Sequence, residues 1–334
     1  MTDERGFTIV EVLIATLIMM VIVGATFMLL NPAQGMFAVQ PEVSDMQQRL
    51  RVAIDMIAKD VMMAGAGISS GPMTGPLGHT LAAVLPYRVG ATGADSSDQY
   101  FSDRISVLYV PGSVGQTKTG DPVASTVPAV TVTSEPGCPI GNAACGIDKG
   151  MAVLIMDESG AWDAFTVADV QGAALQLQHR GPQLSKVYDA GAVLSQLSMV
   201  TYWLKTDPLT QTDQLMRYDG NRSDLPIADN VVGLAFEYFA APPPGAPDPE
   251  LVKLPKTELT DGPWRPDGVS PGHYDADLLR VRSVRVTLRV QIANRSYRGA
   301  AGPFFVHGGT SNGGERYVPD QEITFDVAPR NLGR

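Results

Sequence analysis

The sequence contains few of the residues that build metal sites. Its 334 residues include two cysteines and four histidines. The histidines are scattered, and none has the HxxxH or HExxH spacing that holds a metal on one helix face: His79, His179, His273 and His307. Two cysteines cannot supply the four ligands of a structural zinc site. We therefore expect neither a metal nor another cofactor.

Basic residues are also in the minority. Lys and Arg number 25 against 35 Asp and Glu, a formal net charge of −10. A nucleic-acid-binding surface needs a basic stripe that neutralises phosphates, so nucleic acid is not an expected partner. The longest basic cluster alternates with apolar residues, which predicts the solvated face of a strand: Arg280, Arg282, Arg285 and Arg289.

Two short patterns look like functional motifs but lack the context that those motifs need. Gly67–Gly71 fits G-x-S-x-G, whose nucleophile sits between a strand and a helix. Here the pattern follows a predicted helix, so we interpret it as a helix stop. Asp219–Asp224 has oxygen ligands at alternate positions but lacks the glycine and closing glutamate of a calcium loop. It predicts a turn between strands, and the sequence predicts no enzyme.

The two cysteines, Cys138 and Cys145, lie in a segment rich in glycine and proline. If this segment is exported, a disulfide that closes a small loop is the favoured interpretation. Such a loop stabilises a domain by about 2–3 kcal/mol in the chain-entropy model. The alternative is a pair of free thiols in a loop.

One long apolar run stands at the N-terminus. Phe7–Leu30 is apolar except for threonine, glycine and one carboxylate, and it follows a short polar segment, residues 1–6. As a helix the run is about 36 Å long, enough to cross a membrane. No A-x-A cleavage site follows it, so we expect the run to remain in the mature protein.

The carboxylate in this run is Glu11. A charge inside a membrane helix costs about 2.5–3.5 kcal/mol even on the mildest scale, so such residues are usually functional and paired. A cut between Gly6 and Phe7 creates a free α-amino group at Phe7. In a bundle of such helices, Glu11 of one helix would neutralise the amine of its neighbour and define the axial register. The alternative is a tolerated glutamate that reaches the membrane interface.

The run Gly6-Phe7-Thr8-Ile9-Val10-Glu11, followed by the apolar tract, resembles the signal of type IV prepilins and type II secretion pseudopilins. The resemblance implies cleavage after Gly6 by a prepilin peptidase, N-methylation of Phe7 and a role for Glu11 in filament assembly. It also implies a single-pass inner-membrane precursor that later joins a filament at the cell surface. The implied partners are other major and minor pilins, the peptidase and an inner-membrane assembly platform.

The run ends at Asn31-Pro32, where we expect a kink or short break, with a second break possible near Pro41. Beyond it, apolar residues recur at steps of three and four and predict an amphipathic helix that ends near Gly65–Gly67. The predicted apolar stripe, on which the head packs, is Val43, Met46, Leu50, Ala53, Ile54, Ile57 and Val61. The predicted polar face is Gln47, Gln48, Arg49, Arg51, Asp55, Lys59 and Asp60.

After Gly71 the helical periodicity stops, and short β-branched runs alternate with turn-rich stretches. The predicted strands are Arg104–Val110, Ala152–Met156, Ala164–Val167, Leu175–Gln178, Ser198–Leu204, Gln214–Tyr218, Val231–Phe239, Val281–Gln291 and Glu322–Val327. Long loops are expected at 111–150, 240–275 and 297–317. The fold class is therefore α+β: a leader (1–6), a membrane helix (7–31), an amphipathic helix (32–66) and a β-rich periplasmic or extracellular head (67–334).

The segment Met46–Gly65 is similar to the second half of the N-terminal helix in PilW-type minor pilins. In the head, Asp103–Tyr109 is similar to their first strand after the helix, and Ile227–Tyr238 to a later strand. Val281–Val290 and Phe325–Leu332 complete this collinear series. The resemblance implies a minor pilin that primes pilus assembly or presents an adhesive surface near the tip.

Three other functions compete with this one. The first is a type II secretion pseudopilin of the J class, although a head of this size is large for that class. The second is a ligand-binding domain or enzyme on a pilin-like anchor, which would need a pocket with converging acid and base residues. The third is an ordinary single-pass receptor, which would keep residues 1–6.

Overall fold

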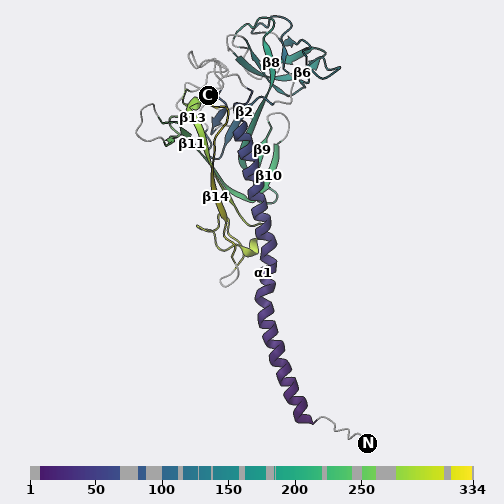
Figure 1. Ribbon diagram of the computed structural model, residues 1–334, viewed down its shortest axis with the longest axis vertical. Helices are drawn as coiled ribbons and strands as arrows, with labels where there is room; N and C mark the ends of the chain where they lie inside the picture. Colours follow the sequence, from purple (N-terminus) through teal and green to yellow (C-terminus); the bar gives the residue numbers. More distant parts are fainter. Residues whose placement is uncertain are drawn as a thin grey trace. The chain divides into compact units, whose positions relative to one another are not determined.

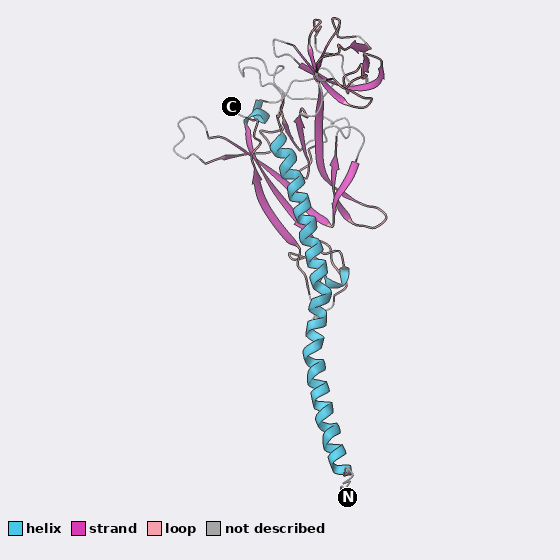
Figure 2. Cartoon of the chain, turned by 45° about the vertical axis from the view of Figure 1, so that its right-hand side comes forward, coloured by secondary structure: helices cyan, strands magenta, loops and turns pink. Residues whose placement is uncertain are grey.

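The structure is a computed structural model of the chain. It describes residues 8–67, 82–87, 100–111, 116–126, 128–136, 138–157, 162–177, 184, 186–219, 224–242, 250–260, 276–311 and 317–332. These residues form one long helix, α1, and two antiparallel sheets (Figures 1 and 2). The α+β class expected from the sequence is confirmed.

Helix α1 runs from Ile9 to Met63 without interruption. The short break that was one expectation at Pro32, and the second break near Pro41, are therefore absent from the helix, and those predictions were wrong, while the alternative of a kink at Pro32 stays a prediction. Each proline removes one N–H donor from the helical ladder. Propagation of an established helix is favourable, so two missing donors leave a helix of 55 residues continuous.

The end of α1 lies where the sequence predicted it. Gly65 and Gly67 have φ of +78° and +70°, a left-handed conformation that favours glycine. Gly65 N donates to Leu108 O, and Val110 N donates to Ala66 O, both at 2.8 Å. The chain after the helix is therefore hydrogen-bonded to strand β2 (Ile105–Tyr109).

The chain divides into two compact units. The first comprises Met1–Gln48 and Ile292–Pro319, and the second comprises Arg49–Gln291 and Asp320–Arg334. In the first unit, the segment Ile292–Pro319 contains a 3-10 turn, η4 (Arg295–Tyr297). Arg298, 6% exposed, donates to the Ile292 and Ala293 carbonyls, and the rings of Phe305 and Tyr317 pack at 6.0 Å.

The second unit holds every strand of the described chain. A ten-stranded sheet has β1 (Val84–Pro86), β2, β3 (Thr117–Lys118), β4 (Ala129–Thr131), β5 (Ala152–Met156), β6 (Trp162–Gln171), β7 (Ala174–Leu177), β8 (Val193–Thr206), β9 (Asp213–Tyr218) and β10 (Asp224–Asp229). A four-stranded sheet has β11 (Val231–Ala240), β12 (Val252–Leu254), β13 (Val281–Val290) and β14 (Gln321–Val327), in the order β12-β11-β13-β14. A 3-10 turn, η3 (Ala276–Arg280), precedes β13.

Strand β8 belongs to two parts of the larger sheet (Figure 1). Its first half pairs with β5, through Val193–Leu197, and with β3. Its second half pairs with β2 and β9, through Ser198–Thr206. Because one strand is shared, the β3–β7 region and the β9–β10 hairpin are joined by a continuous backbone ladder.

The β3–β7 region has its own apolar core. Buried side chains from these strands and their connections form one cluster: Val123, Val130, Val132, Ala144, Ile147, Val153, Ile155, Val167, Leu175, Leu184, Tyr188, Ala192 and Leu194. Several of them come from the stretch expected to be a long loop, 111–150. That loop prediction was therefore wrong in part, since β3 and β4 lie within it.

All nine predicted strands are present, with end points that differ by a few residues. Five strands of two to six residues were not predicted, namely β1, β3, β4, β10 and β12. The loop expected at 240–275 was therefore wrong in part, because β12 lies within it. A run of two or three residues offers too few alternations to define a period, and in β10 the proline Pro226 disfavours a strand prediction. The strand around Asp103–Tyr109 is the second after the helix rather than the first, because β1 precedes it.

The interpretation of the arginine-rich run as a strand face is confirmed for Arg282, Arg285 and Arg289, whereas Arg280 lies in η3, before the strand. In β13 the apolar residues are buried and the arginines are partly exposed. Arg285 Nε donates to Asp326 Oδ1 at 2.8 Å, and Arg289 Nε donates to Asp320 Oδ2 at 3.1 Å. These cations are thus neutralised within the sheet, which leaves no basic stripe along β13.

Candidate functional site

The start of α1 forms a reciprocal cap around Glu11. Thr8 precedes the helix, and its N–H and Oγ1 both bond Glu11 Oε2, at 2.9 and 3.0 Å. The Glu11 N–H donates back to Thr8 Oγ1 at 3.3 Å. A Thr-x-x-Glu pair of this kind satisfies two donors that a helix N-terminus otherwise leaves without partners. Gly6 and Phe7, the predicted processing residues, lie outside the described residues.

Both contacts from Thr8 fall on the same oxygen of Glu11. Its other oxygen, Oε1, has no hydrogen-bond partner among the described residues. Glu11 is also the one ionisable residue in Ile9–Met28. The arrangement therefore presents an anionic acceptor at the start of an apolar helix.

Ile9–Met28 is long and apolar enough to span a membrane. Its large apolar side chains are 44–81% exposed. The two threonines are satisfied internally, since Thr16 Oγ1 donates to Leu13 O and Thr26 Oγ1 to Ile22 O. A contiguous apolar surface of this size marks a membrane or protein interface.

At the other end of α1, Asp60 is buried in an ion-paired cluster. Its Oδ2 accepts from Tyr202 Oη at 2.5 Å and from Arg217 Nε at 2.7 Å, and Arg217 Nη2 lies 3.3 Å from Oδ1. Asp60 is 6% exposed, so its assignment to the polar face of the helix was wrong. Asp60 lies three residues after Ile57, and residues three apart lie on the same face of a helix. This spacing indicated that Asp60 shares the face of the apolar stripe, and the prediction did not use it.

Four of the seven residues of the predicted apolar stripe are fully buried, and Val43, Leu50 and Ile54 are partly buried. Met46, Ala53, Ile57 and Val61 are fully buried. Arg49, also assigned to the polar face, is half-buried, and its Nη1 donates to Asp229 O at 3.1 Å and lies 3.4 Å from Gln291 O. The last turns of α1 are thus bonded to the strands and their ends by two charged residues, Arg49 and Asp60.

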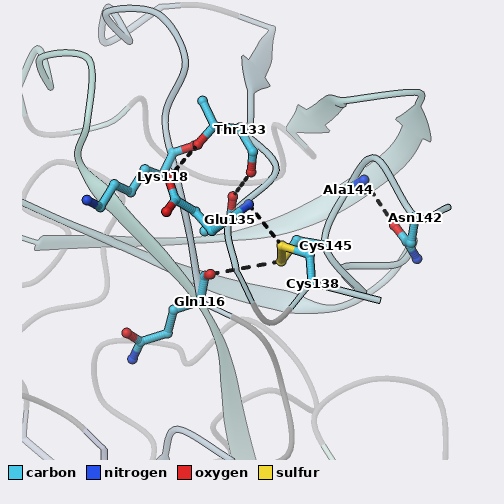
Figure 3. The surroundings of a disulfide bond; sticks show 9 residues. Gln116, Lys118, Thr133, Glu135, Cys138, Asn142, Ala144 and Cys145 are labelled. Carbon is cyan, nitrogen blue, oxygen red and sulfur yellow. Dashed lines mark hydrogen bonds between the residues drawn. A yellow bond between two sulfur atoms is a disulfide. The ribbon is translucent and has the colours of Figure 1, made fainter. Parts of the chain in front are cut away.

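Cys138 and Cys145 are joined by a disulfide (Figure 3). Glu135 N donates to Cys138 Sγ at 3.3 Å, and Cys145 Sγ lies 3.9 Å from the Gln116 carbonyl oxygen. Cys145 is fully buried and has φ of +57°. The loop also carries one core residue of the β3–β7 region, Ala144, and a second, Ile147, follows two residues after Cys145.

The remaining predicted patterns form no site in the described chain. Asp219–Asp224 lies between β9 and β10, as the turn interpretation predicts, but 220–223 lie outside the described residues. Ser69 and the histidines other than His307 also lie outside them. Among the residues that the structure describes, no group of three His, Cys, Asp or Glu side chains is placed to hold a metal.

Comparison with known proteins identifies the N-terminal segment. Residues 1–27 match the model of the prokaryotic N-terminal methylation motif. A solved structure, a type IV-like pilin from Thermus thermophilus, matches with 14% identity, covering 55% of this chain and 87% of that chain at a TM-score of 0.20. No curated protein matches the chain.

A likeness at this identity and TM-score shows neither family nor function, whereas the motif matches the chain's own N-terminal residues. The motif is the signal of type IV pilins, and it covers the capped start of α1 and most of the exposed apolar stretch. The sheets that follow belong to the same α+β chain. The chain therefore carries a prokaryotic N-terminal methylation motif over the capped, exposed apolar start of α1, and a sheet-rich head follows it.

Proposed function

We propose that the chain is a minor pilin of the PilW type. It is inserted in the inner membrane, cut after Gly6, methylated at Phe7 and assembled through the helix 7–31. Residues 32–66 connect this helix to the head, 67–334, which lies outside the cytoplasm. The head contacts other pilins near the filament tip, where it primes assembly or presents an adhesive surface. Its activity is binding and packing rather than catalysis.

The observation that carries the proposal is the pairing of a methylation motif with an exposed apolar helix that has one charge. Exposed apolar side chains need lipid before assembly and other helices after it. The single carboxylate needs a cation in either setting. A prepilin cut supplies one, because it creates an α-amino group at Phe7, one turn from Glu11.

The cap around Thr8 refines the role of Glu11. Thr8 uses Oε2 within the same chain, so Oε1 remains available to the amine of a neighbouring subunit. One carboxylate would then cap its own helix and neutralise the next chain. This arrangement aligns neighbouring helices, because amine and carboxylate meet at one axial position.

Two glutamate variants separate these roles. Glu11→Gln keeps an oxygen that completes the cap but removes the charge, and Glu11→Ala removes both. We expect both variants to be excluded from filaments, as measured by immunoblotting of sheared pili, with normal membrane levels of the head. Normal incorporation of Glu11→Gln would refute the charge pairing. Loss with Glu11→Ala alone would assign the residue to capping.

Processing is tested by mass spectrometry of the N-terminus after recovery from native membranes. The proposal requires a chain that begins with N-methylated Phe7. A chain that still begins at Met1, in cells that mature other pilins, would contradict it. Finding the mature chain in a secretion complex, with pili unaffected by its deletion, would assign it to the J-class pseudopilins instead.

A further inference from the structure

Strand β14 is the open edge of the four-stranded sheet. It pairs with β13 through seven consecutive residues, Gln321–Val327, without a register shift. Its other edge makes no backbone hydrogen bond to any described residue. Alternate N–H and C=O groups along this edge therefore point away from the sheet, and such an edge is a template for another strand.

The other sheet edges of the described chain are interrupted. Strand β10 has a proline, Pro226, and a bulge at that point, and both disrupt pairing. The strands β1, β4 and β12 have three residues each. Short strands, prolines and bulges are the usual protections against edge pairing. Strand β14 has none of these three.

The two faces of β14 differ in chemistry. On the outer face, Glu322, Thr324 and Asp326 are exposed. On the inner face, Ile323 and Phe325 are only partly buried. Their partners on β13, Leu288 and Val286, are fully buried, so the apolar inner face of the sheet is incompletely covered at this edge. An added strand with apolar residues at alternate positions would cover it.

The charge on the outer face selects the partner. Asp326 is held by Arg285, while Glu322 has no ion-pair partner among the described residues. Two copies of β14 side by side would bring Glu322 and Asp326 of both copies together with no additional cation. Like charges on neighbouring strands are destabilising, and opposite charges are stabilising. Self-pairing is therefore disfavoured, and a cationic strand is favoured.

We propose that β14 is a docking site for an extended segment of a different protein, one with Lys or Arg alternating with apolar residues. The segment adds a fifth strand next to β14 by β-augmentation. One of its cations lies opposite Glu322, and its apolar side chains cover Ile323 and Phe325. This inference uses the sheet alone, so it does not depend on the proposed assembly through α1.

The test uses the full chain in detergent micelles and a nine-residue acetylated peptide of alternating lysine and valine. Amide hydrogen exchange is measured with and without the peptide. We expect saturating peptide to slow hydrogen exchange at alternate amides of residues 321–327 by roughly tenfold or more. The same peptide with N-methylated backbone amides keeps the charge but cannot form the ladder, so we expect no protection from it.

The matched variants are Glu322→Arg and Asp121→Arg, which change the net charge equally at two exposed positions. We expect Glu322→Arg to weaken peptide affinity about threefold to tenfold, and Asp121→Arg to leave it unchanged. Unchanged exchange of the β13 amides shows that each variant is folded. Four results would each overturn the proposal: no protection of β14, equal protection by the N-methylated peptide, equal weakening by both variants, or protection that rises with protein concentration alone, which indicates self-pairing.

Discussion

Arg217 on β9 and Asp60 on α1 form a largely buried ion pair, with Arg217 Nε 2.7 Å from Asp60 Oδ2. The side chains are 20% and 8% exposed, and 157 residues separate them in the chain. Tyr202 on β8 completes the coordination of the carboxylate. One residue of the helix thus joins two neighbouring strands of the larger sheet.

Removing the Asp60 carboxylate should leave the Arg217 cation buried without its partner. Breaking a buried pair in this way typically costs about 3–5 kcal/mol. We therefore expect Asp60→Ala to lower the free energy of unfolding by about this amount, measured by urea denaturation with tryptophan fluorescence. Asp55→Ala removes an exposed carboxylate from the same helix and should change stability by less than about 0.5 kcal/mol. Equal effects of the two changes would show that the pair does not hold the helix to the sheet.

The Tyr202 hydroxyl makes stability depend on pH in the alkaline range. Burial, together with the Asp60 carboxylate, raises the pKa of Tyr202 well above its ordinary value. Above about pH 10 the unfolded chain loses this proton while the native chain keeps it. The unfolded state then binds fewer protons, so the contribution of Tyr202 is present below about pH 10 and is lost as the pH rises towards the native pKa.

Tyr202→Phe isolates this effect. At pH 7 the variant loses a hydrogen bond to a charged group, and we expect a loss of roughly 1.5–3 kcal/mol. The stability difference between the two proteins should narrow as the pH rises above 10. Urea denaturation curves between pH 7 and 11.5 measure this stability difference. A difference that stays constant over that range would contradict the raised pKa of Tyr202.

The cap at Thr8 should stabilise the first turn of α1. Thr8→Ala removes the acceptor for the Glu11 N–H, and loss of an N-cap side chain costs about 1 kcal/mol. We expect amide exchange in the first turn to rise about fivefold in micelles. Thr8→Ser keeps the hydroxyl and should behave like the parent protein. If the first-turn amides of Thr8→Ala and Thr8→Ser exchange at the same rate, the threonine hydroxyl does not cap the helix.

The disulfide should stabilise the β3–β7 region. In the chain-entropy model, a loop with a sequence separation of 7 contributes about 2.5 kcal/mol. We expect the double change Cys138→Ser and Cys145→Ser to lower stability by about this amount, with faster exchange in β4 and β5. Exchange in β13 and β14 should change little, and a uniform rise across both sheets would contradict a local role.

Gly67 should tolerate no side chain. An added Cβ would lie 2.8 Å from Val110 Cβ and 3.0 Å from Val110 O, at a φ of +70°. Gly141 has φ of +80° and nothing within 4 Å of an added Cβ. The change Gly141→Ala therefore measures the cost of backbone strain alone, about 1–2 kcal/mol. We expect Gly67→Ala to destabilise the protein by at least about 1 kcal/mol more than Gly141→Ala in urea denaturation. Similar losses would mean that Val110 moves aside freely.

A feature was predicted correctly where it depends on residues close together in the chain, and was missed where it depends on residues far apart. Strands with clear alternation, such as Val281–Val290, were predicted closely, because residue order alone decides which side chains share a face. Asp60 was misplaced because its polarity favours solvent unless partners are supplied. Those partners, Tyr202 and Arg217, lie 142 and 157 residues away in the chain. Nothing near Asp60 in the sequence indicates them.

Features that depend on local chemistry could be predicted from the order of the residues. These are the apolar run with its single carboxylate, the amphipathic stripe, the glycines that end α1 and the regular strands. The sharing of β8 between two parts of one sheet and the position of β14 at the edge of the other sheet appear only in the folded chain. Backbone pairing carries no side-chain signature, and buried charges are stabilised by residues distant in the chain, so these features require the folded chain.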